Sequence, residues 1–374
     1  MRTRIRNAVA LGAIGLLTAA CGGSAAPASS PSPKAPSPTS ALRASSAGRF
    51  LGCLVTDTGG IDDRSFNASS WQGMQEARAT EPGKITVTYL PSSSGTDYTP
   101  NINTSISKKC GIIVTVGLLM GDNTQAAARA HPNQKFAIVD YAYSPPVKNI
   151  DALMFNTVQD GFLGGYLAAG ISKSGVVGTF GGEELPTVTI YMDGFWDGVR
   201  YYDEQHHARV KVLGWDEQTH SGLFTGNLTD RAAAQADTQT LISEGADVIF
   251  PVAGDAGLGA ARAVQDADAA AGRPKVTMEW ANTDGCFAAP QYCKYFVSSV
   301  TQGIQAAVKN AVLSAANGTF RGGTYVGDLE NGGVALSSFH NFASNVPASL
   351  RSELLAIKAE IISGQIKPAT RSPM

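Results

Sequence analysis

The chain has 374 residues, of which 43% are hydrophobic and 16% charged, with a formal net charge of −2. Without residues 1–20, which hold three Arg and no acid, 26 basic residues face 31 acidic residues, a balance of −5. That balance excludes the basic surface typical of nucleic-acid binding, so we expect no nucleic-acid partner. The apolar content is ample for one large or two ordinary domains, and two is the better expectation.

The first twenty residues have the pattern of an export signal. Three Arg residues precede the apolar run 8–17, which is too short to cross a bilayer. Small residues stand directly before Cys21, which resembles the lipobox of bacterial lipoproteins, although Thr18 occupies the position where Leu is favoured. The resemblance implies a signal peptide at 1–20 and a lipidated, palmitate-bearing Cys21. The protein would then be anchored on the extracytoplasmic face of the cell membrane. The alternative is a plain cleaved signal peptide with Cys21 incidental.

Residues 21–48 are almost entirely Gly, Ser, Ala, Pro and Thr. Such a segment cannot bury a core, and its spaced prolines favour extended polyproline II. We therefore expect a semi-stiff tether at 21–48 and a folded part at 49–374.

From residue 50 onward, short β-branched apolar runs alternate with longer helix-like segments. The predicted strands are 50–56, 84–90, 111–116, 135–140, 152–155, 175–180, 209–214, 247–252, 276–280 and 295–300. The predicted helices are 67–80, 121–130, 159–172, 188–205, 230–243, 256–271, 302–316 and 348–363. This alternation predicts an α/β fold with parallel sheets, and the number of strands indicates two doubly wound, Rossmann-like lobes with a cleft between them.

A loop rich in acids and glycine, 57–67, follows the first predicted strand. In open α/β sheets, ligands bind beyond the carboxyl ends of the strands, where glycine lets the backbone come close. The loop has neither the Gly-x-Gly-x-x-Gly pattern nor a P-loop ending, and its carboxylates would repel a phosphate. It is therefore typical of a site for hydroxyls, amines or ring N–H groups.

Four cysteines remain after Cys21, and an even number outside the cytoplasm suggests disulfides. The doubly wound strand order would bring Cys53 close to Cys110, while Cys286 and Cys293 close a small loop. We expect the pairs Cys53–Cys110 and Cys286–Cys293, with free thiols or other pairings as the alternative. A zinc site is a weaker interpretation because no Cys-x-x-Cys or nearby His accompanies them, so we expect no metal and no cofactor.

Three ordered motifs resemble signatures of the basic membrane lipoprotein family: DTGGIDDRSFN at 57–67, GFLGGYLAA at 161–169 and GADVIFPVAG at 245–254. The resemblance covers roughly residues 50–365. It implies the type I periplasmic-binding-protein fold and an ABC transporter substrate-binding protein. Family members that have been characterised bind purine nucleosides. A nucleoside, with purine favoured, and ABC permease subunits are therefore the expected partners, and we expect a monomer.

In that fold the chain crosses between lobes more than once. The resemblance implies one lobe at about 49–156 and 286–323, and a second at about 157–285 and 324–374.

The resemblance also implies which residues contact a ligand. Asp57 falls at a base-binding carboxylate and Phe66 at a stacking aromatic, although a turn former and a core anchor are the alternatives. Asn67 is equally consistent with a helix cap. Asp122 matches a cleft aspartate that could instead be a cap, and Gly254 follows another strand. A further aromatic wall is implied at Tyr191.

Three expected ligand positions depart from the family pattern. Leu228 replaces a second stacking Phe, Asn282 replaces the first acid of a pair that keeps Asp284, and Gln302 replaces a Lys. Losing one aromatic face and two charges indicates a shifted or weaker ligand.

Two other classes of function compete with a transport receptor. The acids near Asp57 could serve a hydrolase, but the five His show no metal-ligand spacing and no Gly-x-Ser-x-Gly elbow is present, so we expect no enzyme. A signalling or surface receptor lipoprotein for another small polar ligand requires only a ligand-dependent closed state, as a transport receptor does.

Overall fold

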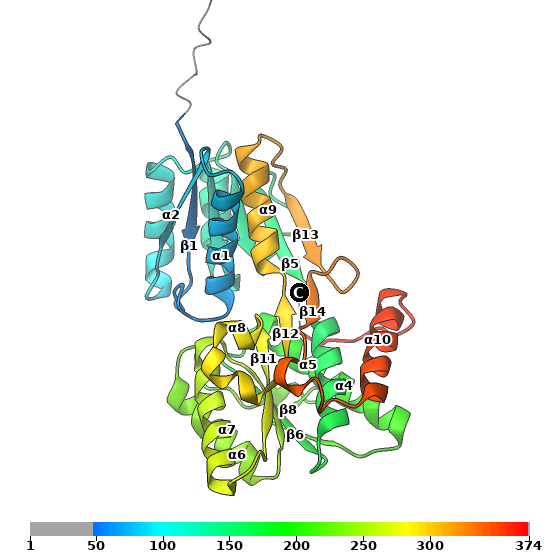
Figure 1. The fold of residues 1–374 in the computed structure, drawn as a ribbon. Helices are drawn as coiled ribbons and strands as arrows, with labels where there is room; N and C mark the ends of the chain where they lie inside the picture. The colour runs from blue at the N-terminus through cyan, green and yellow to red at the C-terminus, as the bar shows by residue number, and fades with distance from the viewer. Residues whose placement is uncertain (1–47, 373–374) are drawn as a thin grey trace, which may run out of the picture. The chain divides into compact units, whose positions relative to one another are not determined.

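A computed structural model describes residues 48–372, which form one compact unit with the two predicted doubly wound α/β lobes (Figure 1). The expected signal peptide, the tether and Cys21 lie outside the described residues. None of the helices in the described part is long and apolar enough to cross a membrane.

The first sheet is parallel and has the strand order β13-β5-β4-β3-β1-β2. Its strands are β1 (Phe50–Val55), β2 (Ile85–Leu90), β3 (Ile112–Val116), β4 (Phe136–Val139), β5 (Ile150–Phe155) and β13 (Gly323–Gly327). The strand order reverses between β1 and β3. The loops that follow these two strands therefore diverge and leave a crevice at their carboxyl ends.

The second sheet has the same plan, β14-β12-β11-β10-β6-β7, with β14 antiparallel to β12. Its strands are β6 (Val176–Gly181), β7 (Lys211–Leu213), β10 (Val248–Val252), β11 (Thr277–Asn282), β12 (Phe296–Gln302) and β14 (Val334–Leu336). A small hairpin, β8 (Trp215–Asp216) and β9 (Ser221–Gly222), follows β7.

Helices pack on these sheets, and α1 and α9 lie side by side on the first lobe (Figure 1). The α-helices are α1 (Phe66–Thr80), α2 (Tyr98–Ser107), α3 (Gly121–Ala130), α4 (Thr157–Ile171), α5 (Pro186–His206), α6 (Arg231–Ser243), α7 (Gly257–Ala271), α8 (Gly285–Ala288), α9 (Ile304–Ala316) and α10 (Ala348–Ile362). Short 3-10 turns are η1 (Gly95–Asp97), η2 (Leu118–Met120), η3 (Gly254–Ala256), η4 (Pro290–Tyr295) and η5 (His340–Phe342).

Sheet pairing corrects two of the expected lobe boundaries. Strand β12 was expected in the first lobe, but it pairs with β11 and β14 in the second sheet. Strand β13 pairs with β5 in the first sheet. The chain therefore crosses between β12 and α9, and again between β13 and β14. The first lobe comprises 48–156 and 303–327, and the second comprises 157–302 and 328–372.

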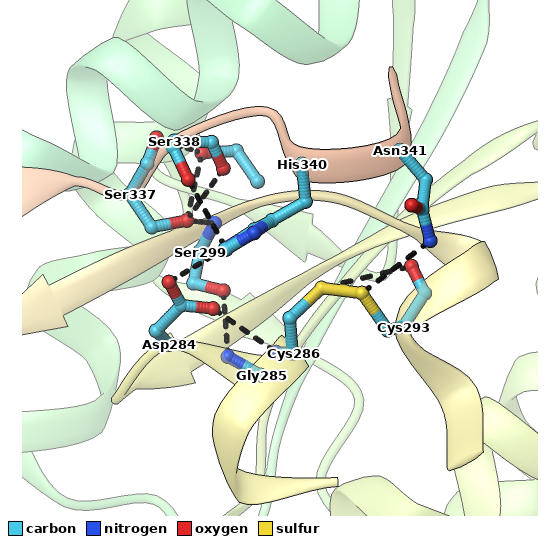
Figure 2. The surroundings of a disulfide bond; sticks show 10 residues. Asp284, Gly285, Cys286, Cys293, Ser299, Ser337, Ser338, His340 and Asn341 are labelled. Carbon is cyan, nitrogen blue, oxygen red and sulfur yellow. Dashed lines mark hydrogen bonds and ion pairs between the residues drawn. A yellow bond between two sulfur atoms is a disulfide. The ribbon is translucent and has the colours of Figure 1, made fainter. Parts of the chain in front are cut away.

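Both predicted disulfides are confirmed. Cys53 on β1 is bonded to Cys110, which precedes β3, and both are buried. Cys286 on α8 is bonded to Cys293 in η4 (Figure 2). The first bond links two neighbouring strands of the sheet across 57 residues of sequence, whereas the second closes a loop of 7.

We expect these two bonds to differ in their effect on stability. In the chain-entropy model, the Cys53→Ala/Cys110→Ala variant loses about 4 kcal/mol of unfolding free energy, because its disulfide closes the longer loop. The Cys286→Ala/Cys293→Ala variant loses about 2.5 kcal/mol. Urea unfolding of both double variants beside the parent measures the difference. Equal losses would show that loop closure is not the source of the stabilisation.

Candidate functional site

The 57–67 loop is held in shape by the buried carboxylate of Asp63. Its Oδ1 accepts hydrogen bonds from the backbone N–H groups of Ser65 at 3.0 Å and Ala68 at 2.9 Å. Its Oδ2 accepts from the backbone N–H of Asn67 at 2.8 Å and from Nδ2 of the same residue at 3.0 Å. These donors lie at the start of α1, where backbone N–H groups lack helical partners. Asp63 thus fixes the entry of α1 and both its oxygens are occupied.

Asp57 lies at the carboxyl end of β1 and is buried. Its Oδ1 accepts from the Gly59 N–H at 2.9 Å and from Asn67 Nδ2 at 2.6 Å, and its own N–H donates to Asn67 Oδ1 at 3.2 Å. Burial is the main cause that raises the pKa of Asp57 to about 6. Asn67 therefore serves the loop itself, and its amide group is engaged by protein atoms.

The second oxygen of Asp57 and the ring of Phe66 border the same small space. A Cβ placed on Gly117 would lie 3.3 Å from Asp57 Oδ2 and 3.7 Å from Phe66 Cε1. Gly117 adopts φ +105°, a conformation that strongly favours glycine. Since this residue has no side chain, the carboxylate and the ring edge stay open to a cavity that all three residues line.

That cavity has a volume of about 80 Å³ and has walls from both lobes. A second cavity of about 270 Å³ adjoins it, and the two share Leu118, Asp140 and Thr187 as lining residues. The second lobe contributes five apolar residues to the first cavity: Leu185, Val188, Leu228, Val252 and Gly254. It also contributes four polar ones: Glu183, Thr187, Asp255 and Asn282. An aromatic ring on one side and an aliphatic wall on the other suit a flat, partly apolar ligand.

Asn282, at the end of β11, lines the cavity and connects the lobes. Its Nδ2 donates to Ser65 Oγ at 2.8 Å, and its Oδ1 accepts from the Tyr191 hydroxyl at 3.0 Å. Tyr191 itself is buried and is not among the cavity's lining residues. The expected aromatic wall at Tyr191 therefore does not lie on this cavity, and the tyrosine instead holds Asn282.

Gln302, at the end of β12, lies against Asp140, which follows β4. Gln302 Nε2 donates to Asp140 Oδ2 at 3.3 Å, and both residues line the larger cavity. Burial is the main cause that raises the pKa of Asp140 to about 7. A neutral amide at position 302 thus leaves this carboxylate without a positive partner among the described residues.

Two further predicted ligand residues, Asp122 and Asp284, line neither of these two cavities. Asp122 is exposed in the first turn of α3, where an acid favours the helix dipole. Asp284 caps α8 and contacts His340 Nε2 at 2.7 Å, beside the Cys286–Cys293 bond (Figure 2). Ligand atoms of Asp284, Cys286 and His340 lie within 4.8 Å of one another, but the Cys286 sulfur is committed to the disulfide.

Sequence reasoning missed two cavity residues, Asp140 and Glu183. Asp140 lies at the carboxyl end of a predicted strand in the first sheet, and Asp57 directly follows another. The rule that ligands bind at the carboxyl ends of strands could therefore have identified Asp140 as well. Glu183 follows β6 in the same way on the second sheet. Asp140 also adopts φ +58°, which is uncommon for a residue other than glycine and is concentrated at functional sites.

The raised pKa of Asp140 makes stability depend on pH. Between its ordinary pKa of 3.8 and its folded value of about 7, the folded state holds more protons than the unfolded chain, so stability falls as pH rises. Asp140→Asn should remove this loss and be more stable than the parent at pH 8 by up to about 4 kcal/mol. At pH 4 the two should converge.

Urea unfolding of the Asp140→Asn variant and the parent at pH 4 and pH 8 tests this expectation. The exposed Asp122→Asn serves as the matched control and should follow the parent at both values. If the unfolding free energies of Asp140→Asn and the parent differed by the same amount at pH 4 and pH 8, the raised pKa of Asp140 would not be the cause of the pH dependence.

Two doubly wound lobes with a cavity between them are the architecture of the type I periplasmic-binding-protein fold. A family model described as "ABC transporter substrate-binding protein PnrA-like" matches residues 51–367. The chain belongs to this family, which is named Bmp, and the resemblance of its three motifs is confirmed.

Relatives and solved structures agree with that assignment. The chain is 28% identical to the "ABC transporter nucleoside-binding protein BmpA" of Lactococcus lactis over 84% of this chain and 87% of the relative. It is 26% identical to an "Uncharacterized lipoprotein" of Pyrococcus abyssi over 75% of this chain and 67% of the relative. A crystal structure of a solute-binding protein from Aeropyrum pernix superposes with a TM-score of 0.77 at 23% identity. It covers 87% of this chain and 94% of that one, and at this identity it supports the fold alone.

Proposed function

We propose that this protein is a lipid-anchored receptor on the outer side of the cell membrane that binds a nucleoside, with purine favoured. It would deliver that ligand to ABC permease subunits as a monomer and without chemical turnover. The anchor at Cys21 is supported by the sequence before it and by the relative named a lipoprotein. Nucleoside binding is supported by the name of the relative from Lactococcus lactis.

The observation that carries the proposal is that Asp57 Oδ2 and the Phe66 ring both border the space beside Gly117. An ionised carboxylate accepts from the N–H donors of a purine, and a ring face stacks on the base with about 1–3 kcal/mol by analogy with protein–base contacts. Leu228 replaces a second ring, but its aliphatic side chain still lines the opposite wall. The proposed site therefore keeps one stacking face and one apolar face.

Isothermal titration of residues 22–374 with adenosine, guanosine, inosine, cytidine and uridine tests the proposal. Saturable binding of a purine nucleoside would support it, and chromatography of the recovered ligand should show an unchanged compound. If a folded sample binds none of the five, the substitutions at Leu228, Asn282 and Gln302 have redirected the cleft, and nucleoside binding is wrong.

A further inference from the structure

The charged side chains that line the two adjoining cavities are all carboxylates. Neither cavity is lined by Lys, Arg or His within the described residues. Asp140 uses one oxygen, for Gln302 Nε2, and Gln302 Oε1 is buried without a hydrogen-bond partner. Gln302 is 7% exposed and Asp140 is 6% exposed, so the bulk solvent does little to satisfy these atoms. A buried acceptor left without a donor is costly, so a ligand that donates here would be favoured.

Each of the three side-chain amides on the same walls donates at least one hydrogen bond to a protein atom. Asn67 Nδ2 donates to Asp57 and Asp63, and Asn282 Nδ2 donates to Ser65 Oγ. Gln302 Nε2 donates to Asp140. Asn282 and Gln302 each keep a second amide hydrogen, but every ionised group of the site is an acceptor, so the site offers mainly oxygens to a ligand.

Two of the five cavity carboxylates are already engaged by protein donors on both oxygens. Asp63 accepts four hydrogen bonds within its loop. Asp255 is held by Arg231 in a two-point pair, with Nε to Oδ2 at 2.7 Å and Nη2 to Oδ1 at 2.6 Å. These two acids have structural partners and are not free to bind a ligand strongly.

The other three carboxylates, Asp57, Asp140 and Glu183, each keep at least one oxygen without a protein donor. Asp57 comes from the first lobe and Glu183 from the second, and no donor or cation in the described part of the chain contacts the Glu183 carboxylate. Burial and the nearby negative charges of Asp63 and Glu183 all raise the pKa of Asp57, so these acids sense one another. A positive charge between them would relieve that repulsion, whereas a phosphate would add to it.

The positive charge that these carboxylates would attract fits an organic cation better than a metal ion. Among the described residues, the ligand atoms of Asp284, Cys286 and His340 lie close enough together to hold a metal ion. This group contains none of the cavity carboxylates. Carboxylates spread around an apolar-walled cavity instead suit a larger ligand that presents a charged amine to one wall and a flat body to another.

We propose that this cleft selects a nucleoside-like ligand that carries a protonated amine, and that Glu183 is the specificity-determining residue that recognises the amine. This inference rests on the proposed nucleoside site and narrows its ligand class to aminonucleosides or similar cations. Nucleoside phosphates are excluded by the same charges. Glu183 supplies the attraction from the second lobe, so the amine also favours the closed arrangement of the two lobes.

The test is a titration of residues 22–374 at pH 7 with four matched probes. These are adenosine, 5′-amino-5′-deoxyadenosine, 3′-amino-3′-deoxyadenosine and adenosine 5′-monophosphate. We expect at least one amine to bind about 10- to 100-fold more tightly than adenosine, as a charge-assisted hydrogen bond allows, and the monophosphate not to bind. The ratio of amine to adenosine affinity is the readout.

Two neutral variants show whether Glu183 causes the preference. Glu183→Gln should bring the ratio close to one, and Glu184→Gln should leave it unchanged, because that neighbouring acid is exposed and lies outside the cavity lining. Adenosine binding as tight as that of both amines, or a preference that survives Glu183→Gln, would overturn the inference and leave the nucleoside site standing. Silence with all four probes from a folded sample would overturn both.

Discussion

Replacing Asp57 with Ala should abolish measurable nucleoside binding while the protein stays folded. Asp57 is the loop carboxylate with one oxygen, Oδ2, turned toward Gly117 and the Phe66 ring. A hydrogen bond to an ionised group contributes more than a neutral one, and here it would be made in a buried site with little competition from water. Isothermal titration should show a loss of at least about 100-fold in affinity.

The same substitution also removes the Oδ1 acceptor that the Gly59 N–H and Asn67 use. Asp57→Asn separates the two roles, because an amide oxygen can still accept those bonds while an NH₂ group replaces Oδ2. We expect Asp57→Asn to unfold at a midpoint no lower than the parent's at pH 7, because burial raises the pKa of Asp57 and a neutral amide avoids the cost of the buried charge. The variant should still lose binding. Asp62→Ala, an exposed acid in the same loop, is the matched control and should bind normally. Normal binding by Asp57→Asn would remove this loop from the site.

The predicted strands of both sheets were recognised because buried parallel strands are nearly continuous apolar runs. Strand β3 shows why, since all its residues from Ile112 to Val116 are buried. All eight predicted helices agree with the structure to within about two residues at each end. The doubly wound plan then followed from simple alternation, and the carboxyl-end rule placed Asp57 at the cavity.

The missed elements have weak local signals. Helix α2 consists of Tyr98–Ser107, where Thr, Asn, Ser and one Pro are all poor helix formers in a helix interior. It forms because Tyr98, Ile102 and Ser105 are buried against the lobe. Strands β13 and β14 are short and lie at sheet edges, and β13 begins and ends with Gly. Tertiary contacts decide such segments, so the lobe boundaries that depend on them were also misplaced.

Residue roles were harder to predict than their locations. The family resemblance marked Tyr191 as an aromatic wall and left Asn67 open between a ligand group and a helix cap. The structure shows each engaged with another protein side chain. Asp140 shares the strand-end position of Asp57, but its significance depends on Gln302, 162 residues away in sequence. Which oxygens remain free is a property of three-dimensional partners, and local sequence does not encode it.

The glycine motif at 161–169 has a structural explanation in the contact between α4 and α5. A Cβ on Gly165 would lie 1.9 Å from the carbonyl oxygen of Phe195, and one on Gly198 would lie 2.0 Å from that of Phe162. Both obstacles are backbone atoms of the facing helix, so neither can rotate away. The two helices therefore pack backbone to backbone, and each needs glycine where the other approaches.

Gly165→Leu should yield no folded protein, and Gly165→Ala should lose about 3 kcal/mol of unfolding free energy. Alanine would gain up to about 1 kcal/mol of helix propensity, but the overlap with a fixed carbonyl outweighs it. Urea unfolding measures the Ala variant, and circular dichroism of the soluble fraction measures the Leu variant. Gly83→Ala is the control, since no atom lies within 4 Å of its added Cβ, and it should stay within about 0.5 kcal/mol. A Gly165→Ala variant as stable as the parent would mean that α4 and α5 can move apart at no cost. The close backbone contact would then not be the reason for glycine at this position.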